Sequence, residues 1–196
     1  VEDFKDGEDI LFSLIPRERL VRLLQHVLDE SEFLSPGGIR SLSKRHEEPY
    51  SISIEGEDYS INYEPGESNT SMFGGNSNWR GPVWFPTNYL LIESLREYYK
   101  YYGDDLKLEF PSNSGNKLNL SQIADEISNR LISIFTINEE GNRPVNEGNT
   151  LYQDPHFKDN ILFYEYFHGD NSRGVGASHQ TGWTGIVAKL INKYKE

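Results

Sequence analysis

The chain has 196 residues, of which 36% are hydrophobic and 26% are charged, and its formal net charge is −12. This composition predicts one soluble, globular unit with a sizeable core. The acidic balance and the lack of a basic stripe argue against binding to nucleic acid or to an anionic membrane surface. The sequence has no cysteine, which excludes disulfides, thiolate metal ligands and a cysteine nucleophile.

The first predicted elements are a helix and a β-hairpin. Pro16 suits the first position of a helix, and the glycine-containing residues 35–38 end it. Its apolar stripe consists of Leu20, Val21, Leu24, Val27 and Leu28. Further along, Ile52 and Ile54 alternate with polar residues and face Tyr59 across residues 55–58. This alternation predicts a β-hairpin.

Two longer helices are predicted in the middle of the chain, after a long loop. Residues 65–81 have no periodicity and are rich in Gly, Ser and Asn, which is typical of a functional loop. A helix is expected over residues 87–102, with Gly103 as its stop. Asn119 and Gln122 predict a capping box that opens the next helix. That helix carries an apolar stripe of Ile123, Ile127, Leu131 and Ile134.

The C-terminal part is predicted to contain two further helices. A polar loop at residues 139–149 precedes a helix over residues 155–168. A glycine-rich loop at residues 170–182 leads to the last helix, with a stripe of Val187, Leu190 and Tyr194. The elements together predict an all-α chain of about five helices with one hairpin, whose functional loops lie at one end.

Glu165 is the most informative residue of the predicted helix at 155–168. The stripe of that helix is Phe157, Ile161, Tyr164 and His168, and Glu165 shares its face. A carboxylate on an apolar face is costly to bury, and burial raises a carboxyl pKa toward the range useful for proton transfer. From periodicity alone, however, an exposed Glu165 or one paired with an arginine is the better interpretation.

Two other segments combine aromatic and polar residues just before helices. In residues 78–86, Trp79 and Trp84 flank Arg80 in a loop stiffened by glycine and proline. Rigid aromatic rings suit stacking on a sugar, and a packed loop anchored by its tryptophans is an equally good interpretation. In residues 176–185, Ser178 adjoins His179 without a nucleophile elbow, so pocket lining or satisfied buried hydrogen bonds are favoured over a serine hydrolase. No metal-binding motif occurs, and neither a metal nor a cofactor is expected.

The segment GNSNWRGPVW at residues 75–84 is followed directly by FPTNYL. This motif resembles one of glycoside hydrolase family 63, the family of processing α-glucosidase I (mannosyl-oligosaccharide glucosidase), and its spacing also resembles a trehalase signature. The segment FYEYF at residues 163–167 and GWTG at residues 182–185 resemble the family's C-terminal motif. Residues 35–43, SPGGIRSLS, resemble a loop that reaches the pocket. The resemblance runs from about Pro16 to the C-terminus.

The resemblance implies an (α/α)6 barrel and hydrolysis with inversion at the anomeric carbon. It assigns the general base to Glu165, against the interpretation that periodicity favours. It also implies that substrate-binding side chains lie in the matching motifs. These are Arg40, Asn78, Trp79, Arg80, Trp84, Gln180 and Trp183. The implied substrates are α-linked glucosyl oligosaccharides or small α-glucosides, and the implied location is the cytoplasm.

The sequence departs from the family pattern in one large respect. The general acid of the family is an aspartate in an upstream motif, and Asp154 and Asp170 stand in contexts that do not match it. Closing the barrel also takes more than the about five helices predicted here. Residues 1–196 are therefore expected to be the C-terminal portion of one barrel domain, inactive alone, with the N-terminal remainder as its partner. The alternative is a non-catalytic carbohydrate-binding or structural fragment.

Overall fold

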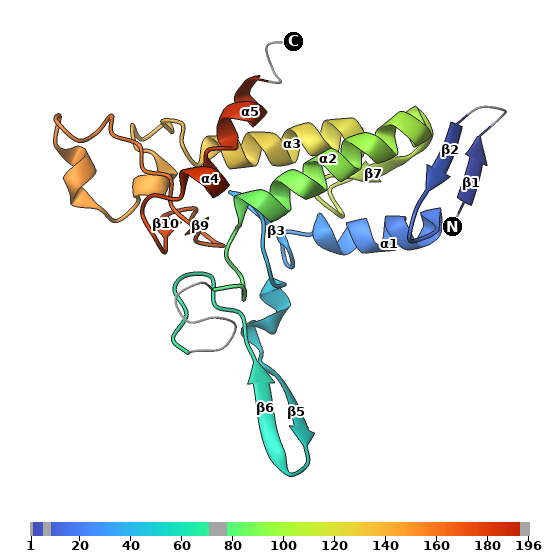
Figure 1. The fold of residues 1–196 in the computed structure, drawn as a ribbon, viewed down its shortest axis with the longest axis horizontal. Coiled ribbons are helices and arrows are strands. Elements are labelled where there is room, and N and C mark those ends of the chain that lie inside the picture. The colour runs from blue at the N-terminus through green and yellow to red at the C-terminus, as the bar shows by residue number, and fades with distance from the viewer. Residues whose placement is uncertain (1, 6–8, 71–77, 193–196) are drawn as a thin grey trace.

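The computed structural model describes residues 2–5, 9–70 and 78–192, so Tyr194 and residues 75–77 of the predicted motifs lie outside the described residues. Three helices form the centre of the molecule (Figure 1). They are α1 (Arg17–Val27), α2 (Phe85–Tyr102) and α3 (Leu120–Ser133). Two short helices, α4 (Thr181–Thr184) and α5 (Val187–Asn192), follow near the C-terminus.

The strands occur between the helices and pair antiparallel in twos within the described part of the chain. They are β1 (Glu2–Lys5) with β2 (Asp9–Phe12), β3 (Leu34–Ser35) with β4 (Gly38–Ile39), β5 (Tyr50–Ile54) with β6 (Glu57–Ile61), β7 (Lys107–Glu109) with β8 (Lys117–Asn119), and β9 (Tyr166–Phe167) with β10 (Gly174–Val175). The expectation of an all-α chain with one hairpin is therefore wrong, because short strand pairs join most of the helices. The (α/α)6 barrel stays a prediction.

The ends of α2 and α3 follow from local sequence. Trp84 has extended backbone and is the N-cap of α2, so the helix begins two residues earlier than the expected Thr87. Gly103, with φ 55°, ends it as predicted. The predicted capping box of α3 is confirmed, because the side chains of Asn119 and Gln122 each accept a hydrogen bond from the other's backbone N–H at 2.9 and 3.0 Å.

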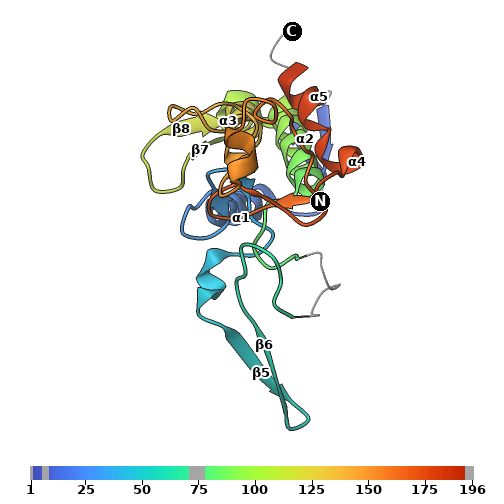
Figure 2. The same cartoon turned by 90° about the vertical axis from the view of Figure 1, so that its left-hand side faces the viewer.

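The hydrophobic core lies where α1, α2 and α3 meet. Figures 1 and 2 both show α2 and α3 side by side, with α1 packed beneath them. The predicted stripes of α1 and α3 are largely confirmed by burial. Fully buried members of this core include Leu24, Leu28, Ile92, Leu95, Ile123, Ile127 and Leu131. Burial of such side chains contributes about 1.5–3 kcal/mol each, which fixes the helices that carry the loops.

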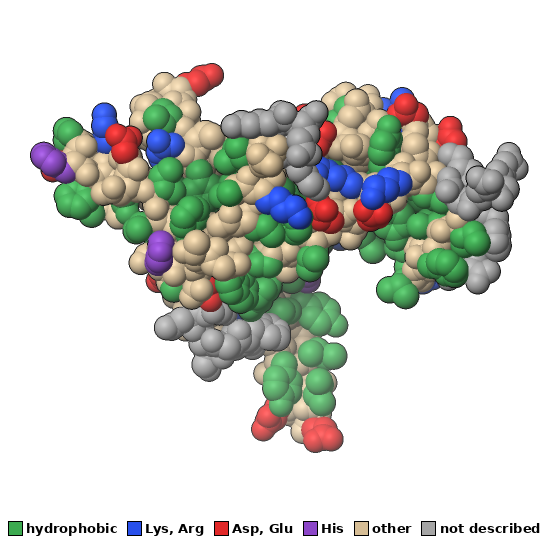
Figure 3. Space-filling view, turned by 45° about the horizontal axis from the view of Figure 1, so that its top comes forward, with side chains coloured by type: hydrophobic (Ala, Val, Ile, Leu, Met, Phe, Trp, Pro, Cys, Tyr) green, Lys and Arg blue, Asp and Glu red, His purple; other side chains and the backbone are tan. Residues whose placement is uncertain are grey.

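The hairpin β5–β6 projects away from the helical body (Figure 2). The predicted hairpin is confirmed, but its connection is shorter than the expected residues 55–58. Ile54 pairs with Glu57 and Ile52 pairs with Tyr59, so the turn contains only Glu55 and Gly56, both with positive φ. Because side chains alternate along a strand, Ile52 and Ile54 share one face of the hairpin. Figure 3 shows this apolar face exposed along the projection, with acidic side chains at its tip.

The predicted helix over residues 155–168 is wrong. Residues 154–159 form a bend and turns, residues 160–164 have no regular secondary structure, and β9 follows. Phe157 and Ile161, expected on a buried stripe, are 40% and 37% exposed. The reason is long-range pairing: Val83 and Phe167 exchange two backbone hydrogen bonds of 2.8 and 2.9 Å, and β10 pairs with the other edge of β9. An aromatic run such as residues 163–167 also favours a strand.

Gly176 shapes the end of the β9–β10 hairpin. The pairing extends past β9, because Glu165 N–H donates to the Ala177 carbonyl at 2.9 Å. Gly176 has φ +72°, and a Cβ there would lie 2.6 Å from Tyr166 Cε1 and 2.9 Å from Glu165 Oε2. A glycine is therefore required both for the backbone conformation and for the space in which these two side chains lie.

Arg40 joins three parts of the chain through its buried guanidinium. Its Nε donates to the Tyr63 hydroxyl at 3.0 Å and to the Gly169 carbonyl at 3.1 Å. Its Nη1 donates to the Leu34 carbonyl at 2.5 Å, and its Nη2 donates to Asp170 Oδ1 at 3.1 Å. Arg40 therefore ties the segment after α1 to the turn between β9 and β10. A direct contact of Arg40 with substrate stays a prediction, since all three nitrogens bind protein.

Asp170 completes this anchor as an ionised partner. Its carboxylate accepts hydrogen bonds from Arg40, from the Tyr63 hydroxyl at 3.0 Å and from Lys44 at 3.3 Å. Burial alone would raise the pKa of Asp170, but the hydrogen bonds from Tyr63 and Lys44 and the nearby positive charges outweigh burial and lower it.

We predict that Gly176→Ala destabilises the protein more than a matched glycine replacement does. A positive φ costs an alanine about 1 kcal/mol or more, and here the methyl group also meets the buried Tyr166 ring. Gly115 is the control, because its φ of +78° is similar and nothing lies within 4 Å of an added Cβ. Urea unfolding of both variants measures the difference. Equal losses would contradict the constraint on Tyr166 and Glu165.

We predict that Asp170→Asn lowers stability at neutral pH and that the loss shrinks in acid. The lowered pKa means that the carboxylate's contribution is fully present above the ordinary value of 3.8 and disappears as the pH falls through the folded value. Thermal unfolding between neutral pH and pH values below 3.8 measures this, with the exposed Asp159→Asn as control. A difference that is independent of pH would contradict an ion-pair role for Asp170.

Candidate active site

Four aromatic side chains gather at the start of α2. The buried Trp84 ring stacks on Trp79 with centroids 4.0 Å apart and planes inclined by 4°, and on Tyr166 at 4.7 Å and 23°. Trp183 lies against Trp84 at 5.5 Å in a tilted arrangement. Trp84 and Tyr166 are fully buried, whereas Trp79 is 36% and Trp183 is 40% exposed. The structure thus brings together three of the predicted site residues and presents two of them at the surface.

The position of Trp84 is set by backbone contacts on both sides of it. The neighbouring residue Val83 pairs with Phe167 of β9, which draws the loop before α2 against the β9–β10 hairpin. The indole Nε1 of Trp84 donates to the Asn78 carbonyl at 3.0 Å. The plane of the ring is therefore fixed before any ligand binds.

Glu165 lies next to this aromatic stack. It precedes Tyr166 in the chain, is half-buried, and its Oε2 accepts a hydrogen bond from Ala177 N–H at 3.3 Å. Burial raises the pKa of Tyr166 to about 12, and the charges of Glu165 and Glu67 also raise it. The site therefore combines a carboxylate with a phenol that keeps its proton at neutral pH.

Asn78 holds the loop that carries Trp79. It is fully buried, and its Nδ2 donates to the carbonyls of Glu64 and Gly66 at 2.6 and 2.7 Å. Its Oδ1 accepts from Arg80 N–H at 2.9 Å. Since the side chain bonds to the protein at both ends, Asn78 positions the loop, and a direct bond to substrate stays a prediction.

Arg80 has the same positioning role and is 1% exposed. Its Nη2 donates to Glu64 Oε2 at 2.5 Å and also to the hydroxyls of Ser68 and Thr70 at 2.7 and 2.9 Å. A buried, hydrogen-bonded ion pair of this kind fixes conformation, because separating it leaves an unpaired charge in the interior. Arg80 therefore organises residues 62–70 around the loop, and contact with a sugar stays a prediction.

Gln180 and Trp183 enter the site through the turn that forms α4. Gln180 N–H donates to the Phe163 carbonyl at 2.5 Å, and the Gln180 carbonyl accepts from Trp183 N–H at 3.0 Å. The hydroxyl of Thr184 donates to the Tyr164 carbonyl at 2.5 Å. These bonds hold α4 against residues 163–164 and place the Trp183 ring over Trp84. The Gln180 side chain is half-buried beside this turn.

Neither Asp154 nor Asp170 suits the role of general acid. Such a group must hold its proton near the working pH. The pKa of Asp170 is lowered by its partners, as described above. Hydrogen bonds from the backbone and then the side chain of His156 lower the pKa of Asp154, which is exposed. Both carboxylates are therefore ionised at neutral pH.

Glu67 is a candidate residue that sequence reasoning missed. It is exposed in the loop after β6, and its charge contributes to the raised pKa of Tyr166, so it lies within electrostatic range of that phenol. The loop was predicted to be functional, but it has no periodicity that singles out one side chain. Only the folded position of the loop reveals Glu67.

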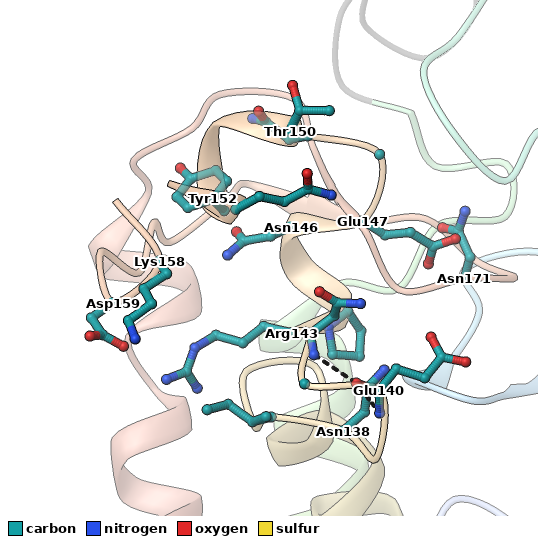
Figure 4. A pocket seen from close by; sticks show the side chains of 17 residues that line it. Asn138, Glu140, Arg143, Asn146, Glu147, Thr150, Tyr152, Lys158, Asp159 and Asn171 are labelled. Carbon is teal, nitrogen blue, oxygen red and sulfur yellow. Dashed lines mark hydrogen bonds between the residues drawn. The ribbon is translucent and has the colours of Figure 1, made fainter. Parts of the chain in front are cut away.

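Two hollows lie outside this cluster. A cavity of about 500 Å³ is formed by residues 137–159 together with Asn171 (Figure 4). A shallower hollow of about 530 Å³ is lined by residues 62–67 with Asn69, His168 and Arg173. Glu165 and the three tryptophans line neither of them. A sugar-sized pocket at Glu165 therefore stays a prediction.

Two kinds of feature are absent from the described residues. Within 2–5, 9–70 and 78–192, no group of three or more His, Cys, Asp or Glu side chains has an arrangement that could hold a metal ion. In the same ranges, no helix is both long and apolar enough to cross a membrane.

Comparison with known proteins gives the family. Residues 10–184 match the family described as "Mannosylglycerate hydrolase MGH1-like glycoside hydrolase domain". An uncharacterised protein of Saccharomyces cerevisiae is 52% identical over 190 residues, which cover 95% of this chain and 18% of that protein. A probable mannosyl-oligosaccharide glucosidase of Schizosaccharomyces pombe is 25% identical over 188 residues, covering 94% of this chain and 17% of that protein. The mannosyl-oligosaccharide glucosidase of Saccharomyces cerevisiae is 24% identical over 185 residues, covering 92% and 16%.

The chain therefore spans less than a fifth of the length of these curated relatives. The family match nevertheless covers nearly all of the chain and includes both the tryptophan loop and Glu165. The relationship to mannosyl-oligosaccharide glucosidases that the motifs predicted is confirmed at a distant level. The chain belongs to the MGH1-like glycoside hydrolase family.

Proposed function

We propose that the protein hydrolyses α-glucosidic bonds with inversion of configuration and that Glu165 is its general base. The observation that carries the proposal is the position of the Glu165 carboxylate beside the stack of Trp79, Trp84 and Tyr166, in a chain of glycoside hydrolase ancestry. A carboxylate next to exposed aromatic rings is the arrangement that a sugar ring and an attacking water require.

The aromatic rings supply the sugar-binding surface in this proposal. One face of Trp79 stacks on Trp84, and Trp79 is still 36% exposed. The apolar C–H face of a pyranose packs on such a ring, while its hydroxyls stay available for hydrogen bonds. Trp183, which is 40% exposed and lies against the same Trp84 ring, gives a second wall.

The chemistry proposed for Glu165 is proton abstraction from water. In an inverting hydrolase the base carboxylate takes a proton from a water that attacks the anomeric carbon, and an acid on the other face protonates the leaving oxygen. The hydrogen bond from Ala177 N–H restricts the orientation of the Glu165 carboxylate, and Gly176 leaves the space that the carboxylate occupies, which favours such positioning. The acid lies about 6.5–9.5 Å from the base in such enzymes, and we place it on a part of the barrel outside this chain.

The proposed substrates are α-linked glucosyl oligosaccharides or small α-glucosides. Two distant relatives are named as mannosyl-oligosaccharide glucosidases, one of them as probable, which supports a glucose-containing substrate. An uncharged sugar is also compatible with the acidic chain, because the net negative charge of the protein does not repel it. We further propose that residues 1–196 complete an (α/α)6 barrel with the N-terminal remainder and that the protein acts in the cytoplasm.

We predict that Glu165→Gln in the natural polypeptide lowers kcat by about two to four orders of magnitude. The amide keeps the size and the acceptor oxygen of the side chain but cannot accept the proton of the attacking water. The measurement is glucose release from maltose and from an aryl α-glucoside, with binding followed by tryptophan fluorescence.

The control for this test is Glu126→Gln, an exposed glutamate of α3 that is remote from the aromatic stack in sequence and element. It should leave kcat and KM unchanged. Near-normal turnover in Glu165→Gln would show that Glu165 is not the general base. Retained sugar binding without turnover in the unaltered natural polypeptide would instead favour a carbohydrate-binding module.

A further inference from the structure

The cavity at the end of α3 is a separate feature from the candidate active site. It measures about 500 Å³, a size common for small-molecule sites. Its walls come from the loop after α3 and the turns up to Asp159, and Asn171 of the β9–β10 turn closes one side, as Figure 4 shows. Since the aromatic stack and Glu165 do not line it, the proposed function does not account for it.

Side-chain amides are the most frequent kind of group in the lining of this cavity. These are Asn138, Asn142, Asn146, Asn149, Gln153 and Asn171. The charged lining residues nearly balance, with Arg143 and Lys158 against Glu140, Glu147 and Asp159. A phosphate site needs an excess of positive charge and a cation site needs clustered carboxylates. The balance therefore favours an uncharged polar ligand.

Three of the amides have a fixed orientation. The Oδ1 atoms of Asn138, Asn149 and Asn171 accept hydrogen bonds of 2.9 to 3.2 Å from backbone N–H groups of their own loops. A backbone N–H can only donate, so the atom that faces it is the oxygen. The NH2 groups then turn away from the backbone, and the described residues provide them with no hydrogen-bond acceptor. These NH2 groups therefore remain available as donors to a ligand at the cavity.

Asn146 contributes an unused acceptor. Its Oδ1 is buried and has no hydrogen-bond partner among the described residues. Such an atom destabilises a folded protein unless something satisfies it, and nearly all buried polar groups are satisfied. Asn146 also lines the cavity, so a rotation of its side-chain amide toward the cavity would bring this oxygen to a ligand hydroxyl that supplies the missing donor.

We propose that this cavity binds a neutral mono- or disaccharide, at a site distinct from the one that contains Glu165. A sugar hydroxyl both donates and accepts, so it satisfies oriented NH2 groups and the Asn146 oxygen together. Tyr152 supplies an aromatic surface in the same cavity, and its hydroxyl bonds to Tyr164, next to Glu165 in the chain. The site therefore adjoins the segment that carries the base without using it.

The test measures sugar binding in the natural polypeptide carrying Glu165→Gln and Trp79→Ala, so that binding at the candidate active site is suppressed. Glucose, mannose and maltose are titrated by calorimetry and saturation-transfer NMR, with inorganic phosphate as the charged comparison. We expect saturable binding of at least one sugar and none of phosphate. Adding Asn146→Leu should weaken this binding about tenfold or more, while the melting temperature is unchanged or higher because an unsatisfied polar atom is removed.

Gln153→Leu provides a second variant, since Gln153 is an exposed lining residue whose side chain makes no hydrogen bond in the described part of the chain. It should weaken sugar binding, whereas the exposed Gln25→Leu on α1 should not. Absence of sugar binding, binding unchanged by Asn146→Leu, or tighter binding of phosphate would overturn the proposal. Full turnover in Glu165→Gln alone would refute Glu165 as the base without affecting the proposed sugar site in the cavity. Failure of the one proposal can therefore be distinguished from failure of the other.

Discussion

The two backbone hydrogen bonds between Val83 and Phe167 are the contact on which the arrangement of the candidate site depends. They join the loop before α2 to β9, although the two residues are far apart in the chain. Because of this contact, Trp84 and Tyr166 stack, and Glu165 emerges at the edge of the aromatic cluster. The pairing of β9 with β10 fixes the other side of Glu165 through Ala177. Without the Val83 contact, neither the stack nor the carboxylate has a defined position relative to the other.

Two buried arginines, Arg40 and Arg80, stabilise the segments on either side of the Val83–Phe167 contact. Arg40 ties the segment after α1 to the β9–β10 turn, and Arg80 ties residues 62–70 to the tryptophan loop. Both guanidinium groups bind protein acceptors, so they orient the surfaces that carry Trp79 and Glu165. A buried charge that is paired in this way favours one conformation of its loop, although the loop has little regular secondary structure. The exposed rings of Trp79 and Trp183 are the parts left for a ligand.

The helices could be predicted from sequence because their signals are local. The stripe of α1, the Asn119 capping box and the Gly103 stop each act within a few residues, and so does the β5–β6 turn. The conformation of residues 155–168 could not be predicted from local sequence, because this segment pairs with Val83 and with β10. The apolar residues of this segment follow helical spacing by coincidence, because aromatic residues are frequent in it. Glu165 was identified by its motif, while Glu67 needed the folded loop.

The most direct test of Glu165 as the base is a crystal structure of the natural polypeptide with a glucose-shaped iminosugar. We expect the sugar ring to pack on Trp79, with Glu165 within hydrogen-bond reach of the water or the ring atom at the anomeric position. We also expect the Val83–Phe167 pairing to be intact in the complex. An inhibitor bound with Glu165 remote from its anomeric position, or on a surface without Trp79 and Trp183, would rule out Glu165 as the base of a site built on these rings.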